Sequence, residues 1–213
     1  MRQVHGNSVA RLDMANLDMA RLDVGRSGVL SAGRQQVGAV AAGLLEADAG
    51  LATDSDTCVA VLVADCVPIA IGSPEGVRLA VHAGWHGLVK GVIRNAADSA
   101  RDAGASALVA GIGPCIAPCC YEFGADDLEK VVEGLGFDAR AVTRHGRPAL
   151  DLRAAARDAL GSAGVEIVHE DVSCTCCSEG WFSWRCRKDV KRQAVYVWKE
   201  EEPTGRVVSA GRA

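Results

Sequence analysis

One run of apolar residues constrains the fold more than any other part of the sequence. Residues 57–64 read TCVAVLVA and are β-branched or apolar at both odd and even positions. This pattern is typical of a strand that is buried on both faces. Asp65 and Pro68 follow it, so we expect the strand to end there, since proline cannot donate to a ladder of hydrogen bonds. Two more strands are predicted over 69–72 and 77–82.

Three stretches are predicted to be helices, over 88–103, 125–135 and 152–163. In the first stretch apolar residues recur at intervals of three and four, and charged residues face away from them. Gly104 follows this stretch, as expected of a residue that closes a helix. Asp151 precedes the third stretch and is predicted to cap its first turn.

The order of these elements favours an α+β fold with mixed sheets. Further strands are expected over 2–9, 107–112, 166–169 and 193–198. Strands and helices therefore alternate irregularly, and hairpins mix with crossovers. No linker rich in glycine, proline or serine divides the chain, so we predict one domain over 1–200 and a frayed tail over 201–213.

The charge balance argues against nucleic acid as a partner. The 213 residues carry a formal net charge of −4, and no block of lysine and arginine concentrates positive charge. The longest apolar run, 58–72, contains Asp65 and is too short to cross a bilayer. No signal peptide is recognisable at the start of the chain. We therefore expect a cytoplasmic protein without a membrane partner, while the oligomeric state stays open.

Nine cysteines are unusual in such a protein, because disulfides are rare in the cytosol. Most of them are expected to be small buried hydrophobic residues. Six lie within 115–120 and 174–177, where their spacings, CxxxCC and CxCC, differ from those of zinc ribbons. Buried thiols are therefore predicted there, with a second metal site as the alternative.

Three candidate metal ligands stand at ends of predicted strands, and they are His5, Cys66 and His82. Two imidazoles and one thiolate would leave the fourth position of a tetrahedral zinc ion open, as in catalytic sites. Such an ion lowers the pKa of a bound water toward neutrality. Spacing alone supports this triad weakly. The alternative is two histidines with satisfied hydrogen bonds and a buried cysteine.

The sequence around these residues resembles the laccase-domain, or YfiH-like, family. The matching motifs are QVHG at 3–6, ADCVPI at 64–69 and HAGW at 82–85. Further motifs follow in the same order, namely GPCI at 113–116, YEFG at 121–124, DL at 151–152, CT at 174–175, FSWR at 182–185 and RQ at 192–193. The resemblance extends over residues 2–198.

Members of that family were first described as polyphenol oxidases and are now assigned as purine nucleoside phosphorylases. The resemblance implies a four-layer α/β/β/α sandwich and a zinc ion at the positions of His5, Cys66 and His82, with copper as a substitute. Cys66 and His82 would act in catalysis through the metal. The implied reaction is phosphorolysis of adenosine, inosine and methylthioadenosine, with adenosine deamination as a side activity. The expected partners are purine nucleosides and phosphate.

Four more residues are candidates for binding the substrate, and they are His86, Tyr121, Glu122 and Arg185. The alternatives are a capping tyrosine, a solvated acid and a surface ion pair of the arginine. At position 86 the family motif has arginine, so a permanent cation is replaced by a side chain that is mostly neutral at pH 7. Asp65 is expected either to orient a metal ligand or to be a strand-end carboxylate with its own hydrogen bonds.

Two other functions are left open. A laccase-like oxidase needs several coppers, yet only three further histidines are present, at 86, 145 and 169. A metal-binding homologue with impaired catalysis is the second alternative. It is favoured by the loss of arginines in two motifs, and by the several dozen residues that family members usually carry before the first motif.

Overall fold

The computed structural model describes residues 7, 9–12 and 47–199. Within this part, six strands form one sheet in the order β1-β2-β5-β4-β6-β9. Their bounds are β1 Val9–Leu12, β2 Ala49–Ala52, β4 Val67–Gly72, β5 Arg78–Ala83, β6 Val109–Ile112 and β9 Glu166–Glu170. The two outer pairs, β1–β2 and β6–β9, are parallel, and the three inner pairs are antiparallel. The predicted mixed sheet is therefore confirmed.

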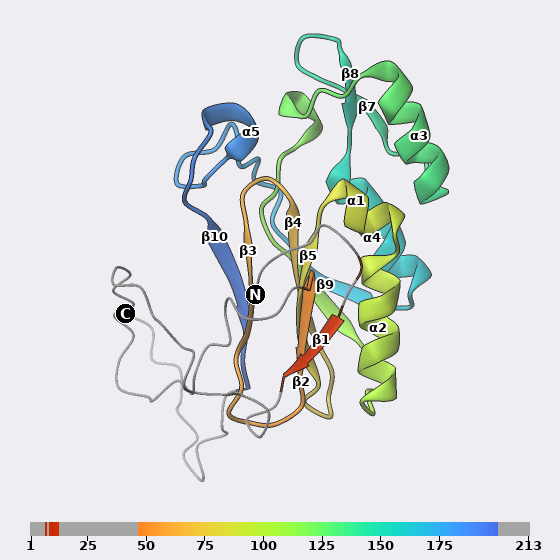
Figure 1. Ribbon diagram of the computed structural model, residues 1–213, viewed down its shortest axis with the longest axis vertical. Coiled ribbons are helices and arrows are strands. Elements are labelled where there is room, and N and C mark those ends of the chain that lie inside the picture. Colours follow the sequence, from red (N-terminus) through yellow and green to blue (C-terminus); the bar gives the residue numbers. More distant parts are fainter. Residues whose placement is uncertain (1–6, 8, 13–46, 200–213) are drawn as a thin grey trace, which may run out of the picture.

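A second, smaller sheet packs on one face of the first. It consists of β3 (Val59–Val63) and β10 (Gln193–Val197), which pair antiparallel and contact β4 and β5 (Figure 1). Alternate residues of β3, such as Val61, are buried against the larger sheet, whereas Leu62 is 47% exposed. The prediction that this strand is buried on both faces is thus wrong, because β3 lies in the outer sheet.

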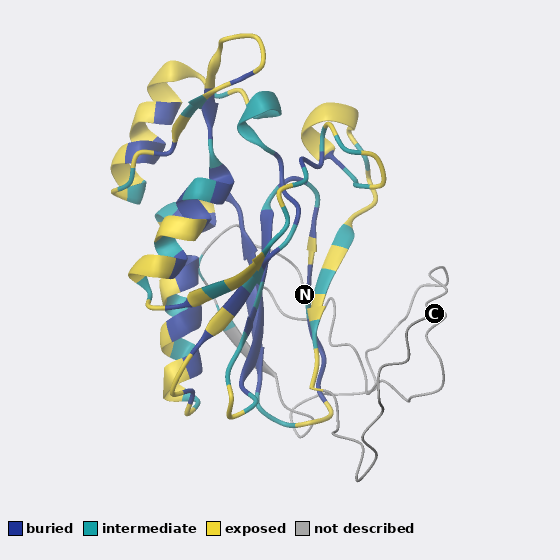
Figure 2. Cartoon of the chain, turned by 180° about the vertical axis from the view of Figure 1, so that it is seen from behind, coloured by how far each residue is buried: buried dark blue, intermediate teal, exposed yellow. Residues whose placement is uncertain are grey.

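Helices pack on the other face of the six-stranded sheet. The helix α2 (Val92–Asp102) contacts β5, β2 and β1, and α4 (Leu152–Ser162) contacts β9 and β4. Figure 2 shows that the helical residues facing the sheet are buried and the opposite ones exposed. The apolar spacing of three and four in the sequence therefore marks the buried face of α2, as expected.

The predicted helix over 88–103 is divided into two. The short helix α1 (Trp85–Val89) ends before Gly91, which has φ 77°, and α2 begins after it. Glycine enters this left-handed region without steric cost, so the chain can change direction there. The predicted ends of two helices are confirmed: Gly104 follows α2 with φ 99°, and the Asp151 side chain accepts a hydrogen bond from the Ala154 N–H at 2.9 Å.

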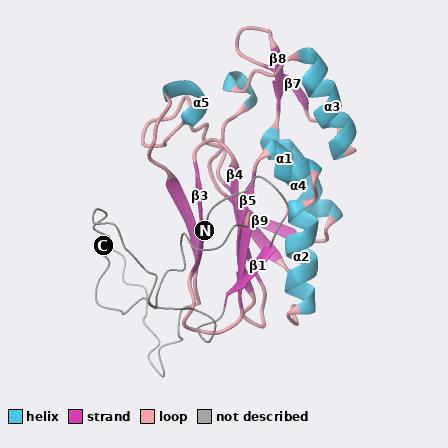
Figure 3. Cartoon of the chain, viewed as in Figure 1, coloured by secondary structure: helices cyan, strands magenta, loops and turns pink. Residues whose placement is uncertain are grey.

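Several smaller elements gather at one end of the molecule (Figure 3). The helix α3 has the predicted bounds, and the hairpin β7–β8, the 3₁₀ turn η3 and the short helix α5 are additions to the prediction. Their bounds are α3 Ala125–Leu135, β7 Arg140–Val142, β8 Pro148–Leu150, η3 Pro118–Cys120 and α5 Trp184–Arg187. Together they form the rim beyond the ends of β4 and β6.

Three layers are thus seen in the described residues: helices, the large sheet and the small sheet. The fourth, helical layer implied by the resemblance is not confirmed. The strand expected over 2–9 and the tail over 201–213 fall almost wholly outside the described residues. None of the described helices has the length and apolar character needed to cross a membrane.

Candidate metal centre

The antiparallel pairing of β4 with β5 brings two of the candidate ligands together. Cys66 directly precedes β4, and His82 lies near the end of β5, opposite Pro68. Because the strands are antiparallel, the beginning of one meets the end of the other. The side chains of Cys66 and His82 are joined by a hydrogen bond.

The buried Asp48 contacts both the imidazole ring and the backbone of His82. Its Oδ1 atom lies 3.3 Å from Nδ1 of His82, and its carbonyl oxygen accepts the His82 backbone N–H at 2.8 Å. Asp48 is 0% exposed and His82 is 2% exposed. Asp48 directly precedes β2, the strand that pairs with β5, so the sheet itself sets this contact.

The surroundings of His82 favour positive charge. Burial lowers the pKa of His82, but its hydrogen bonds to Asp48 and Cys66 and the negative charges of both groups outweigh this effect. The pKa of His82 is raised to about 9 as a result. A buried site with two acidic groups around one imidazole therefore suits a cation, whether a proton or a metal ion.

The donor set fits a zinc ion. Asp48 occupies Nδ1 of His82, so the nitrogen left for Cys66 and for a metal is Nε2. Histidines that bind metals usually have their other nitrogen held by a carboxylate in this way. Cys66 is half-buried and supplies a soft sulfur ligand. The third predicted ligand, His5, lies outside the described residues.

Asp65 joins three segments next to Cys66. Its carboxylate accepts a hydrogen bond from the Thr175 hydroxyl at 2.7 Å and another from the Arg185 backbone N–H at 2.6 Å. Its carbonyl accepts the Ile116 N–H at 2.9 Å. Asp65 has φ 93°, a conformation that aspartate tolerates better than most side chains. The carboxylate therefore has its own hydrogen bonds, and it positions the loops around Cys66.

Tyr121 and Arg185 lie together beside these loops. The Arg185 guanidinium is 5.3 Å from the centre of the Tyr121 ring, and it also donates to the Glu122 carbonyl. Burial raises the pKa of the Tyr121 phenol, as do the nearby charges of Cys66 and Asp65, while Arg185 opposes them. The phenol is therefore protonated at neutral pH and can donate a hydrogen bond.

Glu122 and His86 have other contacts. The Glu122 carboxylate forms an ion pair with Arg147 at 2.8 Å, and both side chains are at least half exposed. Glu122 is therefore a solvated acid, which was the alternative to a role in substrate binding. The exposed His86 ring stacks on Trp85 with ring centres 3.4 Å apart. Trp85 meets Phe123 edge-on at 6.0 Å, and Phe123 meets Tyr121 at 5.2 Å. A row of rings thus connects His86 with Tyr121.

The family follows from comparison with known proteins. The sequence pattern of the family described as multi-copper polyphenol oxidoreductase laccase matches residues 1–200. The chain belongs to this family. Membership indicates a metal cofactor, while the choice between zinc and copper is not set by it.

Relatives of the family carry the name purine nucleoside phosphorylase. One from Streptomyces coelicolor is 36% identical over 71% of this chain and 63% of its own length. The Escherichia coli protein YfiH is 32% identical over the same shares, 71% and 63%. A Corynebacterium glutamicum relative is 31% identical over 95% of this chain and 74% of its length. The chain thus spans less than two thirds of the length of the first two.

Two solved structures share the fold. YlmD from Geobacillus stearothermophilus has a TM-score of 0.69 at 24% identity, over 93% of this chain and 72% of its own. A Neisseria meningitidis protein has a TM-score of 0.68 at 24% identity, over 93% of this chain and 73% of its own.

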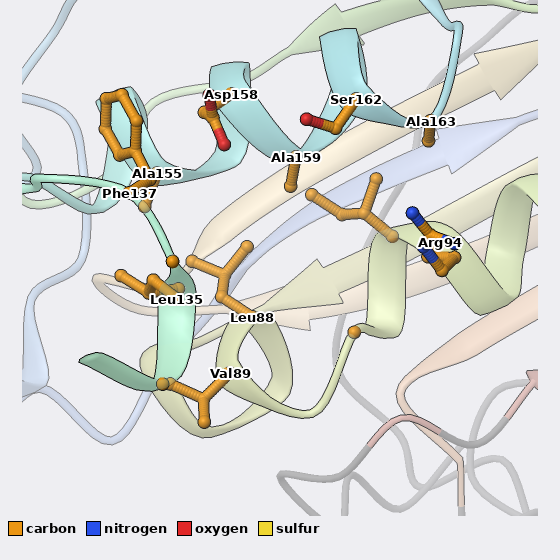
Figure 4. A pocket seen from close by; sticks show the side chains of 14 residues that line it. Leu88, Val89, Arg94, Leu135, Phe137, Ala155, Asp158, Ala159, Ser162 and Ala163 are labelled. Carbon is orange, nitrogen blue, oxygen red and sulfur yellow. The ribbon is translucent and has the colours of Figure 1, made fainter. Parts of the chain in front are cut away.

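A pocket of about 300 Å³ lies away from these residues, among the helices (Figure 4). Its wall includes Leu88 of α1, Arg94 of α2, Leu135 of α3 and Asp158 of α4. None of the candidate site residues that the structure describes lines it. We therefore regard the strand ends at Cys66 and His82, and not this pocket, as the candidate functional site.

The cysteines differ from the sequence expectation. Only Cys58, Cys115 and Cys174 are buried, so the prediction that most of them are is wrong. Cys176 and Cys186 form a disulfide, and the other four thiols are half-buried or exposed. The reason is that most of these cysteines lie in the loops of the rim and not in strands.

Proposed function

We propose that this protein is a zinc-dependent purine nucleoside phosphorylase. It would use phosphate to split adenosine, inosine or methylthioadenosine into the base and ribose 1-phosphate. The contact of Asp48, His82 and Cys66 at one sheet end carries the proposal, because it places a buried imidazole, held by a carboxylate, beside a half-buried thiol that can bind the same metal ion. Relatives at 31% and 36% identity are named purine nucleoside phosphorylases, which supports the substrate class.

His5, Cys66 and His82 would hold the zinc, and Asp48 would fix the orientation of His82. When bound, zinc would supply a Lewis acid that polarises an oxygen of the substrate. Asp48 also keeps the imidazole in one tautomer, with its proton on Nδ1.

Residues of the rim and of the helix α1 would bind the two substrates. The flat rings of Trp85 and Tyr121 offer surfaces on which a purine can stack. The protonated Tyr121 phenol would donate a hydrogen bond, and the Arg185 guanidinium would bind phosphate. His86, at the exposed end of the ring row, would contribute a weaker phosphate donor than the arginine of the family motif. Glu122, paired with Arg147, would shape the rim from outside.

Adenosine deamination is proposed as a side activity, in which water would attack the purine carbon that carries the amino group and ammonia would leave, whereas phosphate attacks the ribose carbon. The description of the family as a multi-copper polyphenol oxidoreductase favours a second candidate, a copper-dependent polyphenol oxidase. A homologue that binds metal without turnover is the third. A cytoplasmic location and the absence of nucleic-acid and membrane partners stay predictions.

One experiment separates these functions. The purified protein is analysed for zinc and copper, and then incubated with adenosine and phosphate. Bound zinc together with phosphate-dependent formation of ribose 1-phosphate supports the phosphorylase. Loss of this activity in Cys66→Ala but not in Cys58→Ala links the activity to the site. Copper with oxidation of a catechol would favour the oxidase, and bound metal without either product would favour the inactive homologue.

A further inference from the structure

Four thiols that the proposed centre does not use meet at the rim. Their sulfur atoms lie within 4.8 Å of one another, and they belong to Cys119, Cys120, Cys174 and Cys177. Cys119 and Cys120 come from η3, and the other two come from the turn before α5. The two segments are 54 or more residues apart in the sequence. We propose that these four cysteines form a second, structural zinc site.

The distances between the sulfur atoms suit a tetrahedral ion. Zinc–sulfur bonds of about 2.3 Å place the sulfurs of a tetrathiolate site about 3.8 Å apart. Cys119 Sγ lies 3.7 Å from Cys120 Sγ and 3.6 Å from Cys177 Sγ. Cys120 and Cys177 are closer, at 3.1 Å, and the exposed Cys177 side chain has room to move outward.

The backbone around Cys174 is arranged as for a thiolate ligand. Cys174 and Cys177 are separated by two residues, the spacing found in many zinc sites. The Ala117 N–H donates to Cys174 Sγ at 3.3 Å, and the backbone N–H groups of Cys176 and Cys177 donate to it as well. Such hydrogen bonds stabilise negative charge on sulfur.

The charge of the site is partly balanced. Four thiolates around Zn²⁺ leave a net negative charge, and Arg144 donates to Cys120 Sγ at 3.1 Å. The disulfide between Cys176 and Cys186 lies next to Cys120, but its sulfurs are bonded to each other and offer no thiolate. The four free thiols are therefore the set that can bind an ion.

The site would fasten the two segments that surround the first centre. Cys120 directly precedes Tyr121, and Cys174 directly precedes Thr175, whose hydroxyl binds Asp65. The backbones of Cys115 and Cys174 form an isolated parallel β-bridge, and the Thr175 N–H donates a hydrogen bond to the Cys115 carbonyl. These contacts already align the two segments. A bound ion would add a further link between the two segments, because each would supply two of its ligands.

The competing chemistry is a disulfide. A bond between Cys120 and Cys177 would need their sulfurs to approach from 3.1 Å to about 2.0 Å and would leave Cys119 and Cys174 unused. A disulfide between the neighbours Cys119 and Cys120 would distort the backbone of η3. The zinc site uses all four thiols with smaller shifts, and the disulfide becomes an outcome of the test.

The test counts zinc per chain in protein purified under argon without added reductant, so that the Cys176–Cys186 disulfide is kept. We expect two equivalents in the wild type and in Cys58→Ala, and one in Cys66→Ala, which lacks a ligand of the first centre. Cys177→Ser alone and together with Cys174→Ser should lose the second equivalent. X-ray absorption of Cys66→Ala should show only sulfur neighbours, at about 2.3 Å.

The outcomes for the two sites are distinct. One equivalent in the wild type that persists in Cys66→Ala and is lost in Cys177→Ser would support this site and refute the first. Three outcomes would each refute the four-cysteine site. They are the absence of zinc from folded Cys66→Ala, nitrogen or oxygen neighbours of zinc in the absorption spectrum of that variant, and a Cys120–Cys177 disulfide in the wild type. The absorption measurement needs no cysteine variant of the cluster, so it decides the matter even if such variants fold poorly.

Discussion

Asp48 and His82 are joined twice, by Oδ1 to Nδ1 at 3.3 Å and by carbonyl to backbone N–H at 2.8 Å. The backbone contact fixes the position of His82, and the side-chain contact fixes the direction of its ring. Both contacts come from the pairing of neighbouring strands, so the orientation of the imidazole is a property of the sheet.

Asp48→Asn should weaken zinc binding without displacing the strands. The amide keeps the shape but is a poorer partner for Nδ1–H, and losses of about 10- to 100-fold in metal affinity are typical for such supporting groups. The measurement is competition for zinc with a chelator of known affinity. Asp151→Asn is the matched control, because asparagine caps a helix as well as aspartate does. Equal affinities in wild type and Asp48→Asn would mean that Asp48 only stabilises the fold.

Cys66→Ala and His82→Ala should each remove the first zinc and abolish phosphorolysis, but their costs in stability should differ. Cys66 is half-buried, so its loss should change the free energy of unfolding by less than about 1.5 kcal/mol. His82→Ala removes one member of the buried Asp48–His82 pair, and such a loss typically costs about 3–5 kcal/mol. Urea unfolding with metal analysis measures both quantities. Retention of stoichiometric zinc by either variant at the first centre would refute the ligand assignment.

The metal-free protein should lose stability as the pH rises from neutrality. The pKa of His82 is about 9 in the folded chain against 6.5 for an unperturbed histidine. A raised pKa stabilises the fold fully below about pH 6.5, and this contribution is lost as the pH rises through 9. It amounts to at most about 3 kcal/mol. Urea unfolding of chelator-treated protein across this range should show the decline, and His82→Gln should flatten it. A decline of equal size in His82→Gln would assign it to other groups.

Regular elements were predictable from the sequence because local periodicity determines them. The helix α3 has the predicted bounds, and Asp151 caps α4 as expected. The break at Gly91 was not predicted, since a single glycine is tolerated inside many helices. The strand β2, AGLA, was missed because it is short and shows no alternation, so only its neighbours β1 and β5 make it a strand.

The candidate site could be predicted only in part, for a related reason. Cys66 and His82 stand in recognisable motifs, but nothing around Asp48 marks it, and its role arises from strand pairing. The four-cysteine cluster was discounted because each segment was compared separately with zinc-ribbon spacings. Its geometry depends on the approach of two segments that are far apart in the sequence. Such juxtapositions become visible only once the chain is folded.

The last prediction concerns His86, which replaces the arginine of the family motif. Its ring is exposed and stacks on Trp85, so it lies at the open end of the ring row. If phosphate binds there, a histidine offers at most one aligned donor and is only partly charged at neutral pH. Use of phosphate should therefore be weak near pH 7.5 and improve toward pH 6, and His86→Arg should strengthen it and remove most of this pH dependence.

The measurement is the dependence of ribose 1-phosphate formation on phosphate concentration, for both forms at both pH values. Deamination of adenosine is the internal control, because it needs no phosphate and should change little in His86→Arg. Arg147→Lys is a matched surface control, since Arg147 pairs with Glu122 and lies outside the proposed phosphate site. If both forms use phosphate equally well while deamination is also unchanged, position 86 serves only to pack against Trp85, and Arg185 is left as the phosphate-binding cation.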